Sequence, residues 1–339
     1  MLNQTAEQML AQFIHNFSVA NNRTDVKKLF SLKPPQETRL RQAIMHQVEF
    51  LTKIYCADVD QISGQVVRTG VSQLYTGRKK DARFSRKIGI EGNEFKLTKT
   101  DSCAVLTWDL LSQWGNSGAE NEFFRLVQTF IEQSFGLDML RIGFNGTHIA
   151  DETDPDTYPN GEDVNKGWHQ IAKEWRGGKQ VLTDPVILGK NGDYKSLDAM
   201  ASDLKNSIRP EFRFDPRLVV LVGTDLVAAE SFRLYQQADK PTEKIAAQLL
   251  SDSVAGMRAY IPPFMPGKRM VVTTLQNLHI YTQRNTRRRA AEDVQDREAF
   301  ESKYWRMEGY ALEIPELYAA IDESAVTIEE EQSAQVNQS

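Results

Sequence analysis

The chain has 339 residues, 40% of them hydrophobic, and a formal net charge of −5. A chain of this length can bury a sizeable core and is more typical of two domains than of one. The acidic balance argues against a general nucleic-acid binder, because binding to phosphate backbones depends on clustered Lys and Arg. Cys56 and Cys103 are too few for a disulfide framework or a four-cysteine zinc site, so we expect two buried thiols.

Targeting and membrane signals are missing from the sequence. No apolar run approaches the roughly 18 residues that span a membrane. The start, MLNQTAEQML, lacks the basic and then apolar pattern of a secretory signal. We therefore expect a soluble protein that is made and resides in a cytoplasm.

The first predicted helix follows Thr5, a suitable N-cap, and ends at Asn21 and Asn22. A basic joint marked by prolines follows over 27–35, and a second helix is expected to start at Pro34 and Pro35. Both helices have apolar residues at helical spacing, so each needs a partner surface. The first stripe is Met9, Leu10, Phe13, Ile14 and Phe17, and the second is Leu40, Ile44, Val48, Leu51 and Ile54.

Short β-favouring pieces broken by glycines predict a long hairpin with an irregular tip over 66–99. Basic residues far outnumber acidic ones in this segment. One interpretation is a solvated face, and the other is a surface that binds an acidic partner. The candidate contact residues are Arg78, Lys79, Lys80 and Arg83.

The longest helical pattern runs from Glu122 to Thr147. Gly143 is expected to form a left-handed C-cap, and Asn145 with Gly146 favours a tight turn. Three- and four-residue steps predict one buried stripe on this helix. The stripe is Phe123, Val127, Phe130, Leu137 and Leu140.

The rest of the chain alternates helices and strands, which predicts a compact α/β unit followed by a return to the first domain. The expected helices are Trp168–Trp175, Ser196–Ile208, Thr224–Phe232 and Gln295–Ser302. The expected strands are Leu218–Val222, Met270–Thr274, Leu278–Tyr281 and Tyr304–Ile314, the last packing on the long helix. The tail over 326–339 has few large apolar residues and is expected to be disordered.

The sequence offers no catalytic, cofactor or metal site. The five histidines are scattered, and the common hydrolase, metalloprotease and nucleotide-binding motifs are missing. Gly223 with Thr224 fits a helix cap better than a phosphate site. The acidic loop over 151–156 fits a solvated loop better than a calcium site, because Pro155 and the lack of a suitably spaced Glu disfavour calcium.

The densest charge cluster is Arg284 with Arg287, Arg288 and Arg289. Such a cluster protects a solvent-facing strand edge from aggregation. It also suits contacts between subunits, where arginines form bidentate pairs with carboxylates. The residues alone leave both interpretations open.

Several motifs occur together in one order between residues 50 and 320. They are EFKLTKTD, IGFNGT, DVNKGW, GDYKSLDAM, DPRLVVLVGTDL, NLHIY, TRRR and FES. This series resembles the major capsid proteins of peduovirus-type phages, contractile-tailed temperate phages with an HK97-like shell. The resemblance implies an α+β fold with a long spine helix and β-sheet in a peripheral domain, an extended β-hairpin loop, and a compact α/β axial domain.

The implied domains follow the chain. They are a scaffold-like segment at 1–30, an N-terminal arm at 31–65, the extended hairpin at 66–105, the peripheral domain at 106–160 and 283–325, the axial domain at 161–282, and the tail at 326–339. In the resembling family the first segment is removed by a phage protease, which implies cleavage between Phe30 and Ser31 in an exposed joint. A permanently docked terminal helix is the alternative. The resemblance also places Arg287, Arg288 and Arg289 near joints between capsomers.

The resemblance implies a non-enzymatic major capsid protein that self-assembles through pentamers and hexamers into an icosahedral shell. The shell would enclose phage double-stranded DNA without sequence-specific binding. Implied partners are a phage scaffold or protease and the portal, without a membrane, and assembly is expected in the host cytoplasm before the subunit resides in the virion. An encapsulin-type nanocompartment is the alternative, and an α/β enzyme ranks third.

Overall fold

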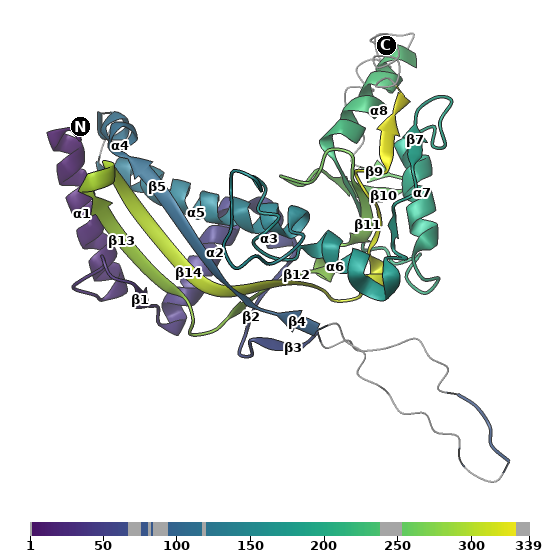
Figure 1. The fold of residues 1–339 in the computed structure, drawn as a ribbon, viewed down its shortest axis with the longest axis horizontal. Coiled ribbons are helices and arrows are strands. Elements are labelled where there is room, and N and C mark those ends of the chain that lie inside the picture. Colours follow the sequence, from purple (N-terminus) through teal and green to yellow (C-terminus); the bar gives the residue numbers. More distant parts are fainter. Residues whose placement is uncertain are drawn as a thin grey trace. The chain divides into compact units, whose positions relative to one another are not determined.

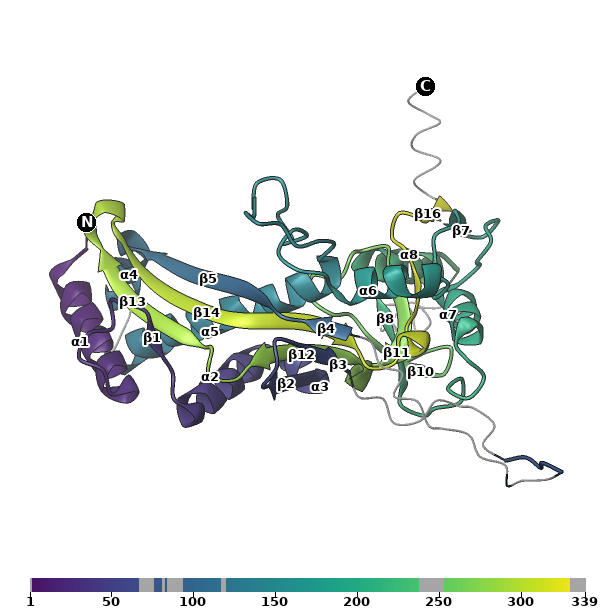
Figure 2. The ribbon, with the colours of Figure 1, turned by 60° about the horizontal axis from the view of Figure 1, so that its bottom comes forward.

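The computed structural model describes residues 2–66, 76–80, 83, 94–116, 120–237 and 253–329. The chain forms two compact units. Figures 1 and 2 show their elements from two directions. None of the described helices is long and apolar enough to cross a membrane. The first unit is Met1–Ser63, Lys96–Leu140 and Ile280–Gly309, and the second is Gly64–Phe95, Arg141–His279 and Tyr310–Ser339.

The first unit is built on a six-stranded sheet in the order β1-β13-β14-β12-β2, with β5 also paired to β14. Strand β14 pairs antiparallel with β5 from Ala299↔Thr107 to Glu308↔Thr98. The strands are β1 (Phe30–Ser31), β2 (Tyr55–Val59), β5 (Thr98–Thr107), β12 (Leu278–Gln283), β13 (Arg288–Val294) and β14 (Ala299–Leu312). The helices are α1 (Gln4–Asn21), α2 (Pro34–Gln47), α3 (Glu49–Lys53), α4 (Trp108–Asn116) and α5 (Glu120–Asn145). A 3-10 turn over Gln295–Arg297 joins β13 to β14, where a short helix was predicted.

Helix α5 is the predicted spine, and Phe135 packs against Tyr304 of β14 with ring centroids 5.6 Å apart. The prediction of its buried stripe is partly wrong. Phe130 is 38% exposed and Leu137 is half-buried, because the buried face follows four-residue steps that leave Phe130 on the flank beside Trp114. The buried stripe is Phe123, Val127, Ile131, Phe135 and Met139.

Gly143 does not form the predicted left-handed cap, because the helix continues through it to Asn145. Its function is close packing instead. A Cβ atom at Gly143 would lie 2.5 Å from the Trp168 ring, so only glycine lets the indole reach the helix backbone. Gly146 is equally crowded, with the Asn165 carbonyl oxygen 2.1 Å from a Cβ there.

The N-terminal helices bury most of the predicted stripes, with Met9 and Ile14 of the first stripe only half-buried, and two predicted features of these helices need correction. Asn3, not Thr5, is the N-cap of α1, and its side chain accepts a hydrogen bond from the Ala6 amide at 2.7 Å. The second predicted helix is broken at Val48, whose extended backbone separates α2 from α3. Val48 packs so closely on α5 that a Cβ at Gly136 would lie 2.8 Å from it.

The second unit contains a six-stranded sheet in the order β6-β15-β11-β8-β10-β9. Its central strand β8 is buried along its whole length, parallel to β10 and antiparallel to β11. The strands are β6 (Val181–Leu182), β8 (Leu218–Val222), β9 (Ser253–Val254), β10 (Met257–Tyr260), β11 (Met270–Thr274) and β15 (Ala319–Ile321). The helices are α6 (Trp168–Glu174), α7 (Leu197–Ser207) and α8 (Thr224–Gln237), with 3-10 turns at Trp175–Gly177, Leu275–Asn277 and Pro315–Leu317.

Three other predictions differ from the structure. The tail is ordered over Val326–Ile328, which forms β16 and pairs with β7 (Val186–Leu188), because Val326 is an apolar residue buried in the core. Residues from Tyr310 onward belong to the second unit, since β15 pairs with β11 there. Strand β12 joins the first sheet, not the α/β sheet.

The predicted hairpin is described only in part. Strands β3 (Ser63–Gln65) and β4 (Glu94–Lys96) pair at its base. The pieces over 67–75, 81–82 and 84–93 lie outside the described residues. The thiols are also less buried than predicted: Cys103 is exposed on β5 and Cys56 is half-buried.

Candidate functional site

The predicted processing bond lies inside a strand. Strand β1 pairs with β13, with Phe30 opposite Arg289 and Ser31 opposite Arg288. Phe30 is 7% exposed, and its ring lies 6.1 Å from that of Phe17 in α1. The predicted bond thus joins a buried Phe30 to an exposed Ser31 in a paired strand, and the residues just before it, at 27–29, are exposed. Cleavage at this bond stays a prediction. A protease that cuts here must first separate β1 from β13.

Strand β13 begins at Arg288, so it carries Arg288 and Arg289 of the arginine cluster, and Arg287 directly precedes it. The side chains of these three residues alternate between two faces. Arg287 and Arg289 are buried, at 1% and 6% exposed, whereas Arg288 is exposed and lies 5.3 Å from the centre of the Trp305 ring. In the isolated subunit, the side chains of Arg287 and Arg289 face the interior and only Arg288 of these three lies at the surface, so the predicted contacts with a neighbouring subunit stay predictions. Arg284 is exposed beside Asp60, at 3.4 Å.

Arg287 is the centre of a buried charge network in the first unit. Its guanidinium forms ion pairs with Asp58 and, at 3.6 Å, with Glu37, and its Nε donates to the Tyr304 hydroxyl at 3.2 Å. Arg41 supplies a second cation, 3.0 Å from Asp58. Burial acts to lower the pKa of Arg287, but Tyr304 and Asp58 outweigh it and the pKa is raised. The network joins α2 to strands β2 and β14 of the sheet.

The basic residues of the hairpin that the structure describes face solvent. Arg78, Lys79, Lys80 and Arg83 are all exposed. None of them has an ion pair with another residue in the described part of the chain. Their contact with a neighbouring subunit stays a prediction.

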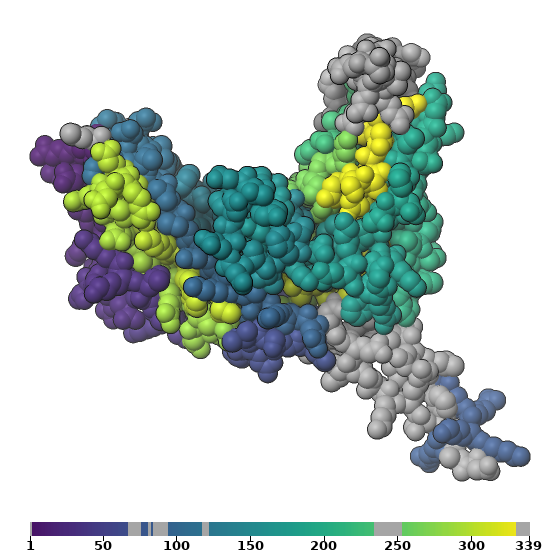
Figure 3. Space-filling view, in the orientation of Figure 1, coloured from purple at the N-terminus to yellow at the C-terminus, as the bar shows by residue number. Residues whose placement is uncertain are grey.

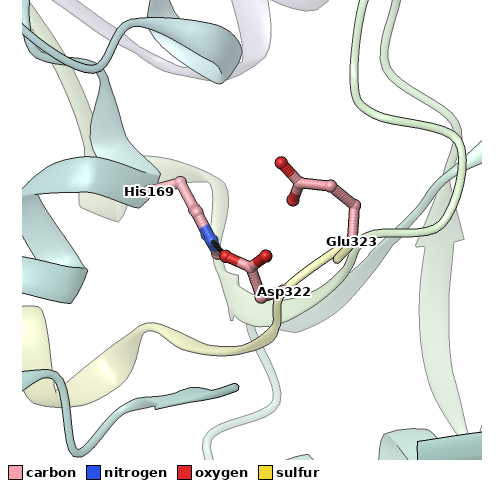
Figure 4. Close-up of side chains that lie close together, drawn as sticks. All are labelled: His169, Asp322 and Glu323. Atoms are coloured by element: carbon pink, nitrogen blue, oxygen red, sulfur yellow. Dashed lines mark hydrogen bonds and ion pairs between the residues drawn. The ribbon is translucent and has the colours of Figure 1, made fainter. Parts of the chain in front are cut away.

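A buried polar cluster in the second unit was not predicted. His169 in α6 lies between the Tyr318 hydroxyl, 3.2 Å from Nδ1, and the Asp322 carboxylate, 3.1 Å from Nε2. Figure 4 shows His169 directed at Asp322, with Glu323 beside it. Burial lowers the pKa of His169 to about 4. The hydrogen bond from His169 holds the pKa of Asp322 well below its usual range.

Ligand atoms of His169, Asp322 and Glu323 lie within 4.8 Å of one another, close enough to hold one metal ion. The carboxylates are already neutralised by protein cations. Arg269 donates to both oxygens of Glu323, at 2.7 and 2.8 Å, and Lys173 forms an ion pair with Asp322. A metal ion would have to displace both cations, so the groups fit a structural cluster better than a metal centre. Sequence spacing could not reveal it, since α6 and the end of β15 are far apart along the chain.

The sequence offered two weaker candidate sites, a phosphate site at Gly223 and Thr224 and a calcium site in the acidic loop over 151–156. In both segments the polar groups have partners within the chain. The amides of Asp225 and Leu226 at the start of α8 donate to the Gly267 carbonyl at 3.0 and 3.2 Å. The helix cap suggested at Gly223 and Thr224 is thus occupied by backbone, which supports the cap over a phosphate site. In the acidic loop, Asp154 accepts a hydrogen bond from the Thr157 hydroxyl at 2.7 Å.

The buried polar groups of both units therefore stabilise the fold of the chain. The fold is the HK97-like fold of phage capsid proteins, as solved structures show. A chain of the satellite phage P4 procapsid matches with a TM-score of 0.74 and 24% identity, covering 94% of this chain and 98% of that one. A capsid chain of an empty GTA particle matches with a TM-score of 0.51 and 12% identity, covering 81% and 89%.

The sequence comparisons define the family. The sequence pattern of the phage major capsid proteins of the P2 family matches residues 6–324. The capsid protein of Escherichia phage P2 is 27% identical over 290 residues, covering 79% of this chain and 80% of that protein. The major capsid protein of Serratia phage KSP20 is 27% identical over 286 residues, covering 78% and 80%. The chain belongs to the P2 family of phage major capsid proteins. The predicted family and fold class are confirmed, and the encapsulin alternative is less well supported.

Proposed function

We propose that many copies of this chain assemble, through pentamers and hexamers, into the icosahedral head shell around phage double-stranded DNA. The observation that carries the proposal is the family match over residues 6–324 together with the HK97-like fold. The activity of a capsid protein is self-association, and a shell is held by many weak contacts repeated between copies. The DNA is enclosed without sequence-specific binding, in keeping with the net charge of −5.

The proposal includes events before the mature virion. The subunit assembles in the host cytoplasm, with a phage scaffold or protease and the portal as partners. Residues 1–30 act during assembly and are cleaved at Phe30–Ser31. The exposed loop over 27–29 supports protease access to the joint, while the pairing of β1 with β13 makes cleavage depend on local opening.

The basic hairpin is the proposed contact with a neighbouring subunit. Its support is the exposure of Arg78, Lys79, Lys80 and Arg83, whose charges have no described partner within the chain. Arg288, the exposed member of the arginine cluster, is the other candidate contact. Acidic surface on a neighbour would steer docking through these cations.

Charge reversal tests the hairpin. The triple variant Arg78→Glu, Lys79→Glu and Lys80→Glu should give a folded, soluble subunit that no longer forms shells in negative-stain images. Circular dichroism checks the fold. Normal assembly of this variant at moderate salt, where exposed charges still interact, would show that the hairpin is merely solvated.

A matched control separates local contact from overall charge. Reversal of three exposed lysines elsewhere changes the net charge by the same amount. Assembly should survive that control and fail only in the hairpin variant. The control residues are Lys179, Lys190 and Lys195.

A further inference from the structure

Helix α1 covers a groove in the first unit that it does not fill. A cavity of about 500 Å³ remains between α1, α2 and α5. This volume is in the range of ligand and side-chain binding pockets in proteins. In the space-filling view, α1 and the strands β13 and β14 border one another on the surface of this unit (Figure 3). The α1 residues that line the cavity are Phe13, Asn16, Phe17, Ala20 and Asn21.

Arg289 lines this cavity as a buried cation. It is 6% exposed, and its Nε has no hydrogen-bond partner among the described residues. One terminal nitrogen donates to the Ser302 hydroxyl at 3.2 Å. Burial lowers the pKa of Arg289 to about 10, so the group stays charged at neutral pH. A buried charge without a paired anion is costly, and a carboxylate in the cavity would relieve that cost.

No carboxylate among the described residues forms an ion pair with Arg289. Glu132 also lines the cavity, and its charge acts to raise the pKa of Arg289, but its carboxylate accepts a hydrogen bond from Gln128 and forms no ion pair with Arg289. Helix α1 offers the guanidinium only the Phe17 ring, whose centre lies 4.8 Å away. The rim adds the exposed cation Arg39. The groove is therefore apolar and cationic, while the helix that lies in it presents no acid to it.

We infer that the groove beneath α1 is a binding site for an amphipathic helix of a different protein that carries a carboxylate facing Arg289. This inference rests on the proposed removal of residues 1–30, which frees the groove. The helix of a second copy would bring the same Phe17 ring and no acid, so charge complementarity favours a different chain. The occupant buries aromatic or aliphatic residues along α5 and places its Asp or Glu against the unpaired Nε.

A competition experiment tests the inference. The full chain carries a recognition sequence for a site-specific protease in the exposed loop at Lys27 and Lys28 and is nicked there, which leaves α1 docked but untethered; trypsin is avoided because it would also cut at the exposed hairpin residues. Peptides of residues 3–22 then compete with α1, and displacement is followed by hydrogen exchange. Peptides with Asn16→Glu or Ala20→Glu should displace α1 at concentrations about tenfold or more below the unmodified peptide, since hydrogen bonds to charged groups are the stronger ones.

Two controls make the result specific. A peptide with Val19→Glu carries the same charge on the side of α1 that is 65% exposed, and should gain nothing. In a chain with Arg289→Met, the advantage of the acidic peptides should vanish. Equal displacement by acidic and unmodified peptides, or an advantage that persists without Arg289, would overturn the inference. Failure of the proposed cleavage is seen separately, as residues 1–30 retained in particles.

Discussion

Removal of the Arg287 guanidinium from the buried charge network should destabilise the first unit strongly. The change Arg287→Ala deprives Glu37, which is 3% exposed, of its ion pair at 3.6 Å. Asp58 loses one partner but keeps Arg41 at 3.0 Å. Loss of one partner from a buried pair costs about 3–5 kcal/mol. We expect the lower end, about 3 kcal/mol, because Asp58 stays paired and the Asn285 amide still donates to Glu37.

Hydrogen exchange measures this loss better than a global melt, because two compact units need not unfold together. Protection of the α2 amides should fall by about two orders of magnitude, with each 1.4 kcal/mol equal to about tenfold. The amides of α7, in the second unit, serve as an internal reference and should not change. The matched variant Arg288→Ala removes an exposed arginine next in sequence and should shift protection by less than about 0.5 kcal/mol. Equal effects of the two variants would refute the role given to the buried network.

Two other predictions concern pH and processing. The second unit should lose stability as pH falls from about 6.5 towards 4, because His169 and His279 have pKa values lowered to about 4 and the unfolded chain takes up those protons first. His169→Gln should flatten this dependence in acid-unfolding curves, by at most about 3 kcal/mol between those pH values; an unchanged curve would mean that His169 is not buried as a neutral group. Mass spectrometry of mature particles should find subunits that begin at Ser31. An intact Met1 helix in those particles would make α1 a permanent docked arm.

Local sequence patterns were sufficient for most elements of the fold. The stripe of α2 and α3 is buried as predicted, at Leu40, Ile44, Val48, Leu51 and Ile54. The sequence predicts the C-terminal end of the spine helix to within two residues of Asn145. The prediction for Gly143 is wrong because a glycine near a helix end can either form a left-handed cap or let a side chain approach the helix backbone closely. Only the position of Trp168 shows which one applies.

The candidate site was harder to predict, because it depends on which face of a strand each residue occupies. Four arginines close in sequence looked like one surface cluster. Alternation into β13 instead buries Arg287, just before the strand, and Arg289 within it, and leaves Arg288 exposed. Likewise, His169 and Asp322 meet only through tertiary packing, so neither spacing nor composition could indicate the pair. The joint at Phe30 looked exposed, since a two-residue strand leaves little trace in a sequence.

Imaging of the purified full-length chain tests the central claim most directly. Negative-stain electron microscopy of concentrated protein should show rings or closed shells built from this subunit. Their formation should weaken when high salt screens the exposed charges of the hairpin. Particles that remain single subunits at every protein and salt concentration would contradict assembly into a shell.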